Sequence, residues 1–143
     1  MTVKMPLLTL TQNNDLCDTN ILSELIRPIP NKGVLEWVAK VSTLYLSVIT
    51  VDEIYFGLKR RPNVKIQKWF EAYLANDCQV LPVTTEIAKY AGELRGQLSL
   101  KGQVRSQADM LIAATAFIHG LRFVTRNERD FKECNIVVMN PFS

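Results

Sequence analysis

Short, unbroken hydrophobic runs alternate along the chain with longer stretches in which hydrophobic positions recur every three or four residues. The runs are rich in Val, Ile and Leu, and they lack the polar alternation of a half-exposed strand, so they are typical of strands buried on both faces of a parallel sheet. Strands are predicted over Tyr45–Thr50, Val80–Val83, Arg122–Thr125 and Asn135–Met139, with a short further segment at Leu16-Cys17.

The stretches between these runs have the spacing of helices. They cover Asn20–Ile26, Val34–Val41, Val51–Arg60, Val64–Asn76, Thr85–Leu100 and Gln107–His119. Turn and cap residues separate them, for example at Asn31 to Gly33 and at Gly120. Strands that alternate with helices predict a three-layer α/β domain, in which a mainly parallel sheet lies between helices.

Composition narrows the class of protein. A chain of 143 residues fits one domain over residues 1–143, and its 48% hydrophobic content is too high for a disordered chain. No hydrophobic run approaches the ~20 residues of a membrane span, and the N-terminus lacks the features of a signal peptide, so we expect a cytoplasmic protein. The three cysteines have no C-x-x-C spacing, which argues against a disulfide framework or a zinc site.

Charge and histidine content limit the chemistry. The net charge of +3 permits contact with nucleic acid without requiring it. Because the chain has one His, a catalytic site would depend on carboxylates, hydroxyls or a metal. Acidic residues follow the predicted strands or open the next helix. These acids are Asp18, Glu53, Asp109 and Asp130.

Each acid has a local explanation as a helix cap. Thr50-x-x-Glu53 and Ser106-x-x-Asp109 match the capping-box pattern, and Asn127-x-x-Asp130 resembles it. Asp18 fits an N-cap by itself. Considered singly, capping is the simpler interpretation of each residue, and it would leave the acids apart and separately exposed.

Considered together, the acids predict a shared site. Parallel strands end at the same edge of a sheet, where ligands bind, so these carboxylates are expected to face one cleft. Adjacent carboxylates repel one another and need either raised pKa values or a bound cation. A set of hard oxygen ligands without Cys or His favours Mg²⁺ or Mn²⁺.

Four segments, in order, resemble the PIN-domain toxins of VapBC-type toxin–antitoxin modules. They are DTNILSE, LSVITVDEIYFGL, ADMLIAATAFIHGLRFVTRNERDF and the VVMNP tail. IRPIPNKGVLEWV after the first segment is most similar to the FitB-like branch. The resemblance implies a PIN fold and a Mg²⁺-dependent endoribonuclease that cleaves RNA phosphodiesters with a metal-activated water. It also implies a cognate antitoxin, a homodimer, and contact with operator DNA only through the antitoxin.

The resemblance also assigns roles by position. Asp18 and Asp109 match the central metal ligands, and Glu53 and Asp130 would complete or orient the metal shell. The supporting polar positions match Asn20 and Thr125, beside the carboxylates or the water, and Asn127, which would fix its loop.

The N-terminus departs from the family pattern. Asn13, Asn14 and Asp15 stand where the family has a solid hydrophobic strand. We expect either a short first strand or a misplaced start codon, which leaves the placement of residues 1–15 open.

Basic residues lie near two of the acids. The predicted RNA-binding set is Lys59, Arg60, Arg61, Arg126 and Arg129, with Lys65 and Lys68 beyond the first group. An acidic metal centre repels an RNA backbone, so a basic rim would hold the phosphates. The alternative is an ordinary solvated helix surface.

Two other functions remain open at this level. One is an antitoxin-bound co-repressor that acts on operator DNA and has little nuclease activity of its own. The other is a nuclease for DNA or flapped structures, as some more distant PIN relatives are. Cleavage assays on RNA and DNA at matched salt would separate these functions.

Overall fold

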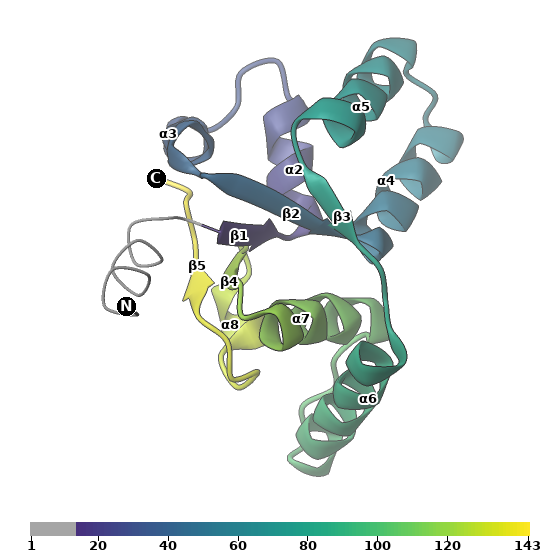
Figure 1. Cartoon of the computed structure of the whole chain (residues 1–143), viewed down its shortest axis with the longest axis vertical. Helices are drawn as coiled ribbons and strands as arrows, with labels where there is room; N and C mark the ends of the chain where they lie inside the picture. The colour runs from purple at the N-terminus through teal and green to yellow at the C-terminus, as the bar shows by residue number, and fades with distance from the viewer. Residues whose placement is uncertain (1–13) are drawn as a thin grey trace, which may run out of the picture.

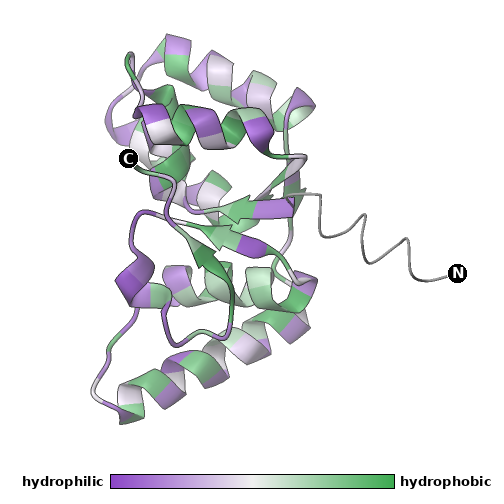
Figure 2. Cartoon of the chain, turned by 90° about the vertical axis from the view of Figure 1, so that its left-hand side faces the viewer, coloured by the Kyte–Doolittle hydropathy of each residue, from purple (hydrophilic) through white to green (hydrophobic). Residues whose placement is uncertain are grey.

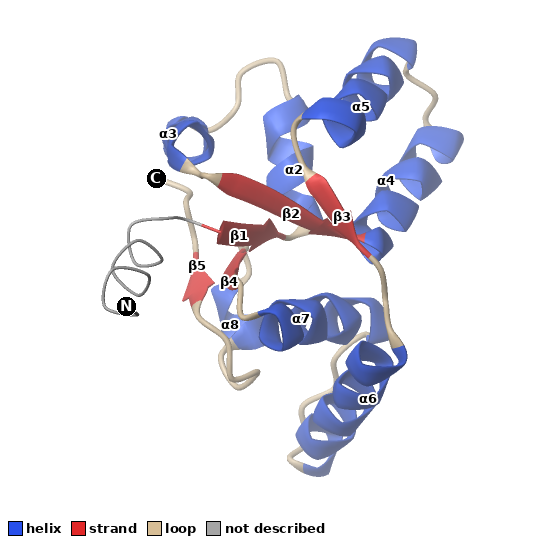
Figure 3. Cartoon of the chain, in the orientation of Figure 1, coloured by secondary structure: helices blue, strands red, loops and turns tan. Residues whose placement is uncertain are grey.

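A parallel five-stranded sheet forms the centre of the molecule (Figures 1 and 3). The computed structural model describes residues 14–143. The strands are β1 (Asn14–Cys17), β2 (Thr43–Ser47), β3 (Gln79–Leu81), β4 (Arg122–Val124) and β5 (Val138–Met139). Their order is β3-β2-β1-β4-β5, and every neighbouring pair is parallel. The predicted α/β class with a parallel sheet is confirmed.

Helices cover both faces of this sheet. They are α2 (Thr19–Ile26), α3 (Lys32–Lys40), α4 (Val48–Arg60), α5 (Val64–Asn76), α6 (Thr85–Leu100), α7 (Gln107–His119) and α8 (Glu128–Phe131). Figure 1 shows α2 to α5 on one side of the sheet and α6 to α8 on the other, which gives the predicted three layers. Among the described helices, none has the length and hydrophobicity to cross a membrane.

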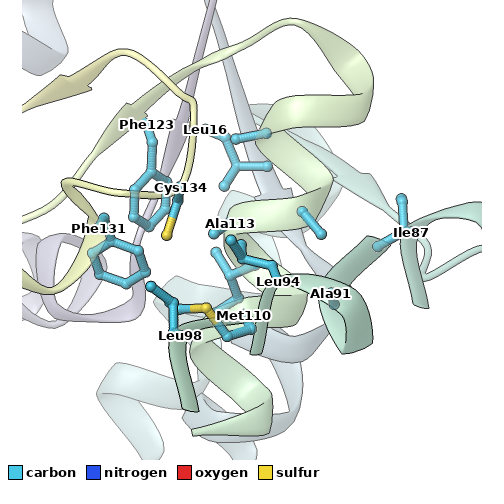
Figure 4. Packing of buried hydrophobic residues seen from close by; sticks show 13 residues of the cluster. Leu16, Ile87, Ala91, Leu94, Leu98, Met110, Ala113, Phe123, Phe131 and Cys134 are labelled. Carbon is cyan, nitrogen blue, oxygen red and sulfur yellow. The ribbon is translucent and has the colours of Figure 1, made fainter. Parts of the chain in front are cut away.

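Two hydrophobic cores lie between the three layers. Successive strand residues point to opposite faces, so Leu16 and Phe123 pack with α6, α7 and α8, whereas Cys17 and Val124 pack with α2 to α5. Figure 4 shows the first core, and Figure 2 shows that the strands are mostly hydrophobic while the helices carry both kinds of residue. Burial on both faces explains why the strand runs do not alternate.

Strand ends differ from the sequence predictions where a local signal ends the strand. The run Tyr45–Thr50 leaves the strand at Ser47, whose hydroxyl accepts a hydrogen bond from the Ile49 N–H (3.0 Å) and caps α4. Only the last two residues of Asn135–Met139 pair with β4, since Asn135 has a positive φ of 56° and turns the chain. Helix α8 carries no hydrophobic period long enough to predict it.

The first strand can contain the buried acid Asp15 because hydrogen-bond donors of two other segments surround its carboxylate. Asp15 is fully buried in β1 and accepts hydrogen bonds from Arg122 Nε (2.9 Å), Arg122 Nη2 (2.7 Å) and Trp37 Nε1 (2.7 Å). Asn14 and Asp15 are therefore strand residues rather than an interruption before a strand. The prediction about the start of the chain otherwise falls on residues 1–13, which lie outside the described part.

Candidate active site

Three of the four predicted acids line one open hollow at the carboxyl edge of the sheet. Asp18 follows β1, Glu53 lies in α4 after β2, and Asp109 lies in the first turn of α7. The hollow has a volume of about 510 Å³. Its other lining residues are Thr19, Asn20, Ser23, Glu24, Arg27, Arg126 and Asn127.

Asp18 is held at the junction of β1 and α2. Its N–H donates to the Val124 carbonyl (2.8 Å), which extends the β1–β4 pairing by one bond. Its Oδ1 accepts from the Thr19 N–H (2.8 Å) and its Oδ2 accepts from the Thr125 hydroxyl (2.8 Å). Asp18 is therefore the N-cap of α2, as predicted, and its second oxygen bonds Thr125 rather than the helix.

Burial makes the Asp18 carboxyl an unusually weak acid for an Asp. The residue is 5% exposed, and loss of solvent raises its pKa from 3.8 to about 6. Hydrogen bonds from Thr125 and Thr19 lower this pKa, and the negative charges of Asp109 and Glu53 raise it further. Burial is thus the main cause of the raised pKa of Asp18, and the charges of Asp109 and Glu53 make smaller contributions in the same direction.

Glu53 is oriented by a threonine that the sequence did not single out. Thr19 Oγ1 donates to Glu53 Oε1 (2.5 Å) and lies 3.1 Å from the buried Thr50 hydroxyl. The capping-box interpretation of Thr50 and Glu53 is wrong, because Ser47 caps α4 and Thr50 lies inside the helix. Glu53 is therefore free of a local capping role and faces the hollow.

Asp109 combines a capping position with a place in the hollow. Its N–H donates to the Ser106 hydroxyl (3.0 Å), so the predicted Ser106 cap is confirmed. Burial raises the pKa of the Asp109 carboxyl, and the nearby charge of Asp130 raises it further. A hydrogen bond from the Ser106 side chain to the carboxyl and the positive charge of Arg105 lower this pKa in part.

Asp130 lies beside this hollow rather than in its lining. It belongs to α8 and lines an adjacent depression together with Arg126, Asn127 and Arg129. Its backbone carbonyl accepts from Arg105 Nε (3.0 Å). The predicted capping box at Asn127 is wrong, since the Asn127 side chain makes no capping hydrogen bond.

The three polar residues predicted to support the site surround the end of β4. Thr125 bonds Asp18 and also accepts the Asn127 N–H (3.0 Å). Asn20 Nδ2 lies 3.4 Å from Asp18 Oδ2 and 3.5 Å from Thr125 Oγ1, and its Oδ1 accepts the Arg126 N–H (3.3 Å). The turn after β4 is thereby tied to the start of α2.

The oxygen donors of the hollow suit a hard cation that keeps part of its water shell. In residues 14–143 no three side chains of the types Asp, Glu, His and Cys are grouped closely enough to ligate one ion. Mg²⁺ is usually bound through one or two carboxylates and retains several waters, so it does not need such a group. The raised pKa values of Asp18 and Asp109 are those of carboxylates that a cation would favour in the ionised form.

The predicted basic residues form two groups, one at the hollow and its neighbouring depression and one at the end of α4. Arg126 lines the hollow, and Arg129 lines the adjacent depression. Lys59, Arg60 and Arg61 lie at the end of α4 and its cap, outside the hollow lining.

Sequence reasoning found Asn20 but missed the rest of the side of the hollow that α2 and its C-cap provide. Ser23, Glu24 and Arg27 line the hollow together with Asn20. Their spacing of three and four residues forms a polar stripe along a helix, a signal that was present in the sequence.

Comparison with known proteins identifies the family to which the fold belongs. The family model of the PIN domain matches residues 16–136. "VapC ribonuclease Y4jK" of Sinorhizobium fredii is 35% identical over 133 residues (87% of this chain and 95% of the relative). "Toxin FitB" of Neisseria gonorrhoeae is 32% identical over 135 residues (89% and 97%).

Solved structures give the same match. The crystal structure of FitAcB from Neisseria gonorrhoeae contains a chain that superposes with a TM-score of 0.77 at 32% identity (89% of this chain and 97% of that one). DNA-bound VapBC from Salmonella typhimurium contains one with a TM-score of 0.78 at 27% identity (90% and 98%).

Proposed function

The chain belongs to the PIN domain family, and from this premise we propose that it is an endoribonuclease toxin of a type II toxin–antitoxin module. The observation that carries the proposal is the gathering of Asp18, Glu53 and Asp109 around one hollow, from three separate segments of the chain. Relatives of similar length carry the names ribonuclease and toxin.

The proposed cofactor is Mg²⁺, or Mn²⁺, held by Asp18 and Asp109 with Glu53 and Asp130 completing or orienting its shell. Such an ion would lower the pKa of a water bound to it and would stabilise negative charge on the phosphate. The lining of the hollow supports this assignment, because its metal-ligating side chains are carboxylates, with no Cys or His among them. Two of these carboxylates, Asp18 and Asp109, also have raised pKa values.

The chain's own residues prepare the site for an attack by water. Thr19 and Thr125 fix the two oxygens of Asp18, and Thr19 also orients Glu53. Asn20 and Asn127 hold the turn that carries Thr125. In the proposed hydrolysis the water oxygen gives up a proton to solvent and forms a bond to phosphorus, while the bond to the 3′ oxygen breaks with its electron pair. The 3′ oxygen then takes up a proton, and no covalent enzyme intermediate forms.

The proposed partner is a cognate antitoxin, and the protein is proposed to form a homodimer. Similar chains occur in the solved structures of FitAcB and of DNA-bound VapBC. Contact with operator DNA is assigned to the antitoxin.

The deciding experiment measures cleavage of RNA and of DNA of the same sequence by the purified protein at one salt concentration. We expect Mg²⁺-dependent cleavage of RNA that EDTA abolishes, and loss of cleavage in Asp18→Asn and Asp109→Asn. Asp77→Asn, at the C-terminal cap of α5 and outside the hollow, is the matched control and should retain activity. Parent-level cleavage by either site variant would refute the assignment of these residues.

Metal binding has a readout that does not depend on activity. An ion that binds only the folded state raises the free energy of unfolding, by about 2.7 kcal/mol at a concentration 100 times the Kd, and therefore raises the Tm. We expect Mg²⁺ to raise the Tm of the parent protein and of Asp77→Asn, and to leave that of Asp18→Asn unchanged. An equal rise in all three would place the ion elsewhere.

A co-repressor function is the second candidate, favoured by the DNA present in several related complexes. It predicts that the purified protein cleaves no RNA with or without Mg²⁺, while its complex with the antitoxin binds operator DNA. The cleavage assay above therefore separates the two functions.

A further inference from the structure

Arg126 lies at the boundary between the hollow and the depression beside it. It follows Thr125 at the end of β4, and it lines both the acidic hollow and the adjacent depression that contains Asp130. The residue is exposed. It is thus a cation between the acids of the proposed site.

Each part of Arg126 is nevertheless fixed by a contact. Its N–H donates to Asn20 Oδ1 (3.3 Å), and its carbonyl accepts from Asn140 Nδ2 (3.5 Å). Its guanidinium carbon lies 4.3 Å from the centre of the Phe142 ring, a cation–π contact. Phe142 donates its own N–H to Asn140 Oδ1 (3.0 Å), so one asparagine ties the arginine and the ring together.

The segment that carries Phe142 is itself anchored on α3. Ser143 donates its N–H to Asn31 Oδ1 (3.1 Å), and the Gly33 N–H donates to Ser143 Oγ (3.2 Å). A Cβ at Gly33 would lie 2.2 Å from the Pro141 carbonyl oxygen, so the segment rests directly on the helix backbone. The Phe142 ring is therefore a fixed support and not a loose surface group.

The guanidinium of Arg126 has no hydrogen-bond or ion-pair partner among the side chains and carbonyls of residues 14–143. The charge of Arg126 contributes to the lowered pKa of Glu24, but Glu24 accepts its hydrogen bonds from Arg27 (3.2 Å) and from the Asn31 N–H (2.7 Å). Arg27 is thus committed to Glu24, whereas Arg126 has its donors available.

We propose that Arg126 binds a phosphate of the RNA strand beside the scissile bond, and that Phe142 is its positioning residue. A guanidinium whose face rests on a ring presents its N–H edge in one orientation, and this planar edge matches the two oxygens of a phosphodiester. The inference rests on the proposed ribonuclease function and adds to it the side chain that holds the substrate.

The test measures the Kd of a short single-stranded RNA in EDTA, where cleavage does not interfere. We expect Arg126→Met to raise the Kd about 10-fold or more, because a charge-assisted hydrogen bond is lost. Arg126→Lys should recover part of this affinity, since it keeps the charge but not the planar fork. Phe142→Leu should raise the Kd about 2- to 5-fold, the range of an exposed cation–π contact.

A matched pair elsewhere in the chain provides the control. Arg60 lies 5.7 Å from the Phe56 ring centre on α4, outside the hollow, so Phe56→Leu removes a similar contact at a place that should not affect binding of a short RNA. Phe142→Tyr should bind like the parent protein, because it keeps the aromatic face.

A double variant distinguishes positioning from a general structural effect. If Phe142 acts through Arg126, Phe142→Leu should leave the Kd of an Arg126→Met protein unchanged. Equal loss of affinity in both backgrounds would overturn the role of Phe142. If the parent protein cleaves RNA and Arg126→Met binds RNA as well as the parent does, the inference fails and the proposed function stands. If the parent protein cleaves no RNA at all, the proposed function itself fails.

Discussion

At the scale of single residues, Asp18 combines two requirements that conflict. Capping α2 and receiving the Thr125 hydroxyl keep its carboxyl inside the molecule, where the ionised form is disfavoured. A metal ligand must be ionised near neutral pH. The raised pKa of about 6 measures this conflict, and it predicts that the residue lowers the stability of the metal-free protein.

The sign of this effect follows from the two pKa values. The Asp18 carboxyl has a pKa of 3.8 when unfolded and about 6 when folded, so the folded state binds more protons between these values. The contribution of Asp18 to the free energy of unfolding therefore falls as the pH rises through this range, and it is lowest above about pH 6. A difference of about two pKa units corresponds to a loss of up to ~3 kcal/mol.

Asp18→Asn should remove this loss, because the amide oxygen still caps α2 and carries no charge. In EDTA at about pH 7.5 we expect the variant to unfold at higher urea than the parent, with a gain of about 1–3 kcal/mol that disappears near pH 4. Chemical denaturation at both pH values measures the difference, with Asp77→Asn as the control. A gain of equal size at both pH values would show that ionisation of Asp18 is not its cause.

Cap and acid residues were also where sequence reasoning succeeded and failed most clearly. Asp18, Ser106 and the acids after the strands were found because strand ends and helix starts have local signatures. Thr19 was missed, since a hydroxyl that bonds a residue 34 positions away leaves no local pattern. Ser47 was missed as a cap because the β-branched residues after it favour a strand.

At the scale of elements, the pairing of β1 with β4 places Asp18 against Thr125. Both strands are short, and the ion pair of the buried Asp15 with the partly exposed Arg122 joins them at the end opposite the acids. The pair is bidentate, and Trp37 of α3 adds a third hydrogen bond. The polar start of β1, which the sequence marks as a departure from the family, thus fixes the alignment of these two strands.

Removing one partner of this pair should be strongly destabilising. Arg122→Met leaves the Asp15 carboxylate buried without its cation, and we expect a loss of about 3 kcal/mol, at the lower end for buried pairs because Arg122 is 31% exposed. Asp15→Asn together with Arg122→Met should recover part of the loss. Urea denaturation of the two single variants and the double variant measures the coupling.

The surface pair of Lys101 and Glu133 is the comparison for this experiment. Both side chains are well exposed, at 62% and 44%, so Lys101→Met should change stability by no more than about 1 kcal/mol. If the effects of Asp15→Asn and Arg122→Met simply add, the two residues do not act as a pair.

At the scale of the whole molecule, the topology of the sheet determines which distant residues meet at the site. Residues 18 and 53 meet because the parallel strands β1 and β2 end at one edge of the sheet, and residue 109 joins them from the start of α7. The meeting of these acids was predictable from the alternation of parallel strands with helices. The support of Arg126 by Phe142 was not, because it depends on how the C-terminal segment crosses α3.

The distance of the basic residues from the hollow helps to separate two interpretations of them, an RNA-binding rim and an ordinary solvated helix surface. Lys59, Arg60 and Arg61 lie six to eight residues beyond Glu53, which is about 9–12 Å along a helix axis. An RNA that fills only the hollow would not need them, whereas a longer strand would pass over them. If they form a rim, their effect depends on the length of the RNA.

Salt dependence measures this directly, because each phosphate contact adds about 0.7 to the slope of log Kd against log salt for a single strand. We expect neutralising Lys59, Arg60 and Arg61 together with Gln to lower the slope by up to about 2 for an RNA of ~16 nucleotides and to leave one of ~4 nucleotides unchanged. Arg126→Met should lower it by about 0.7 for both lengths, since Arg126 lines the hollow itself. An unchanged slope for the longer RNA in the triple variant would mean that the end of α4 is a solvated helix surface, and that RNA is held by the hollow alone.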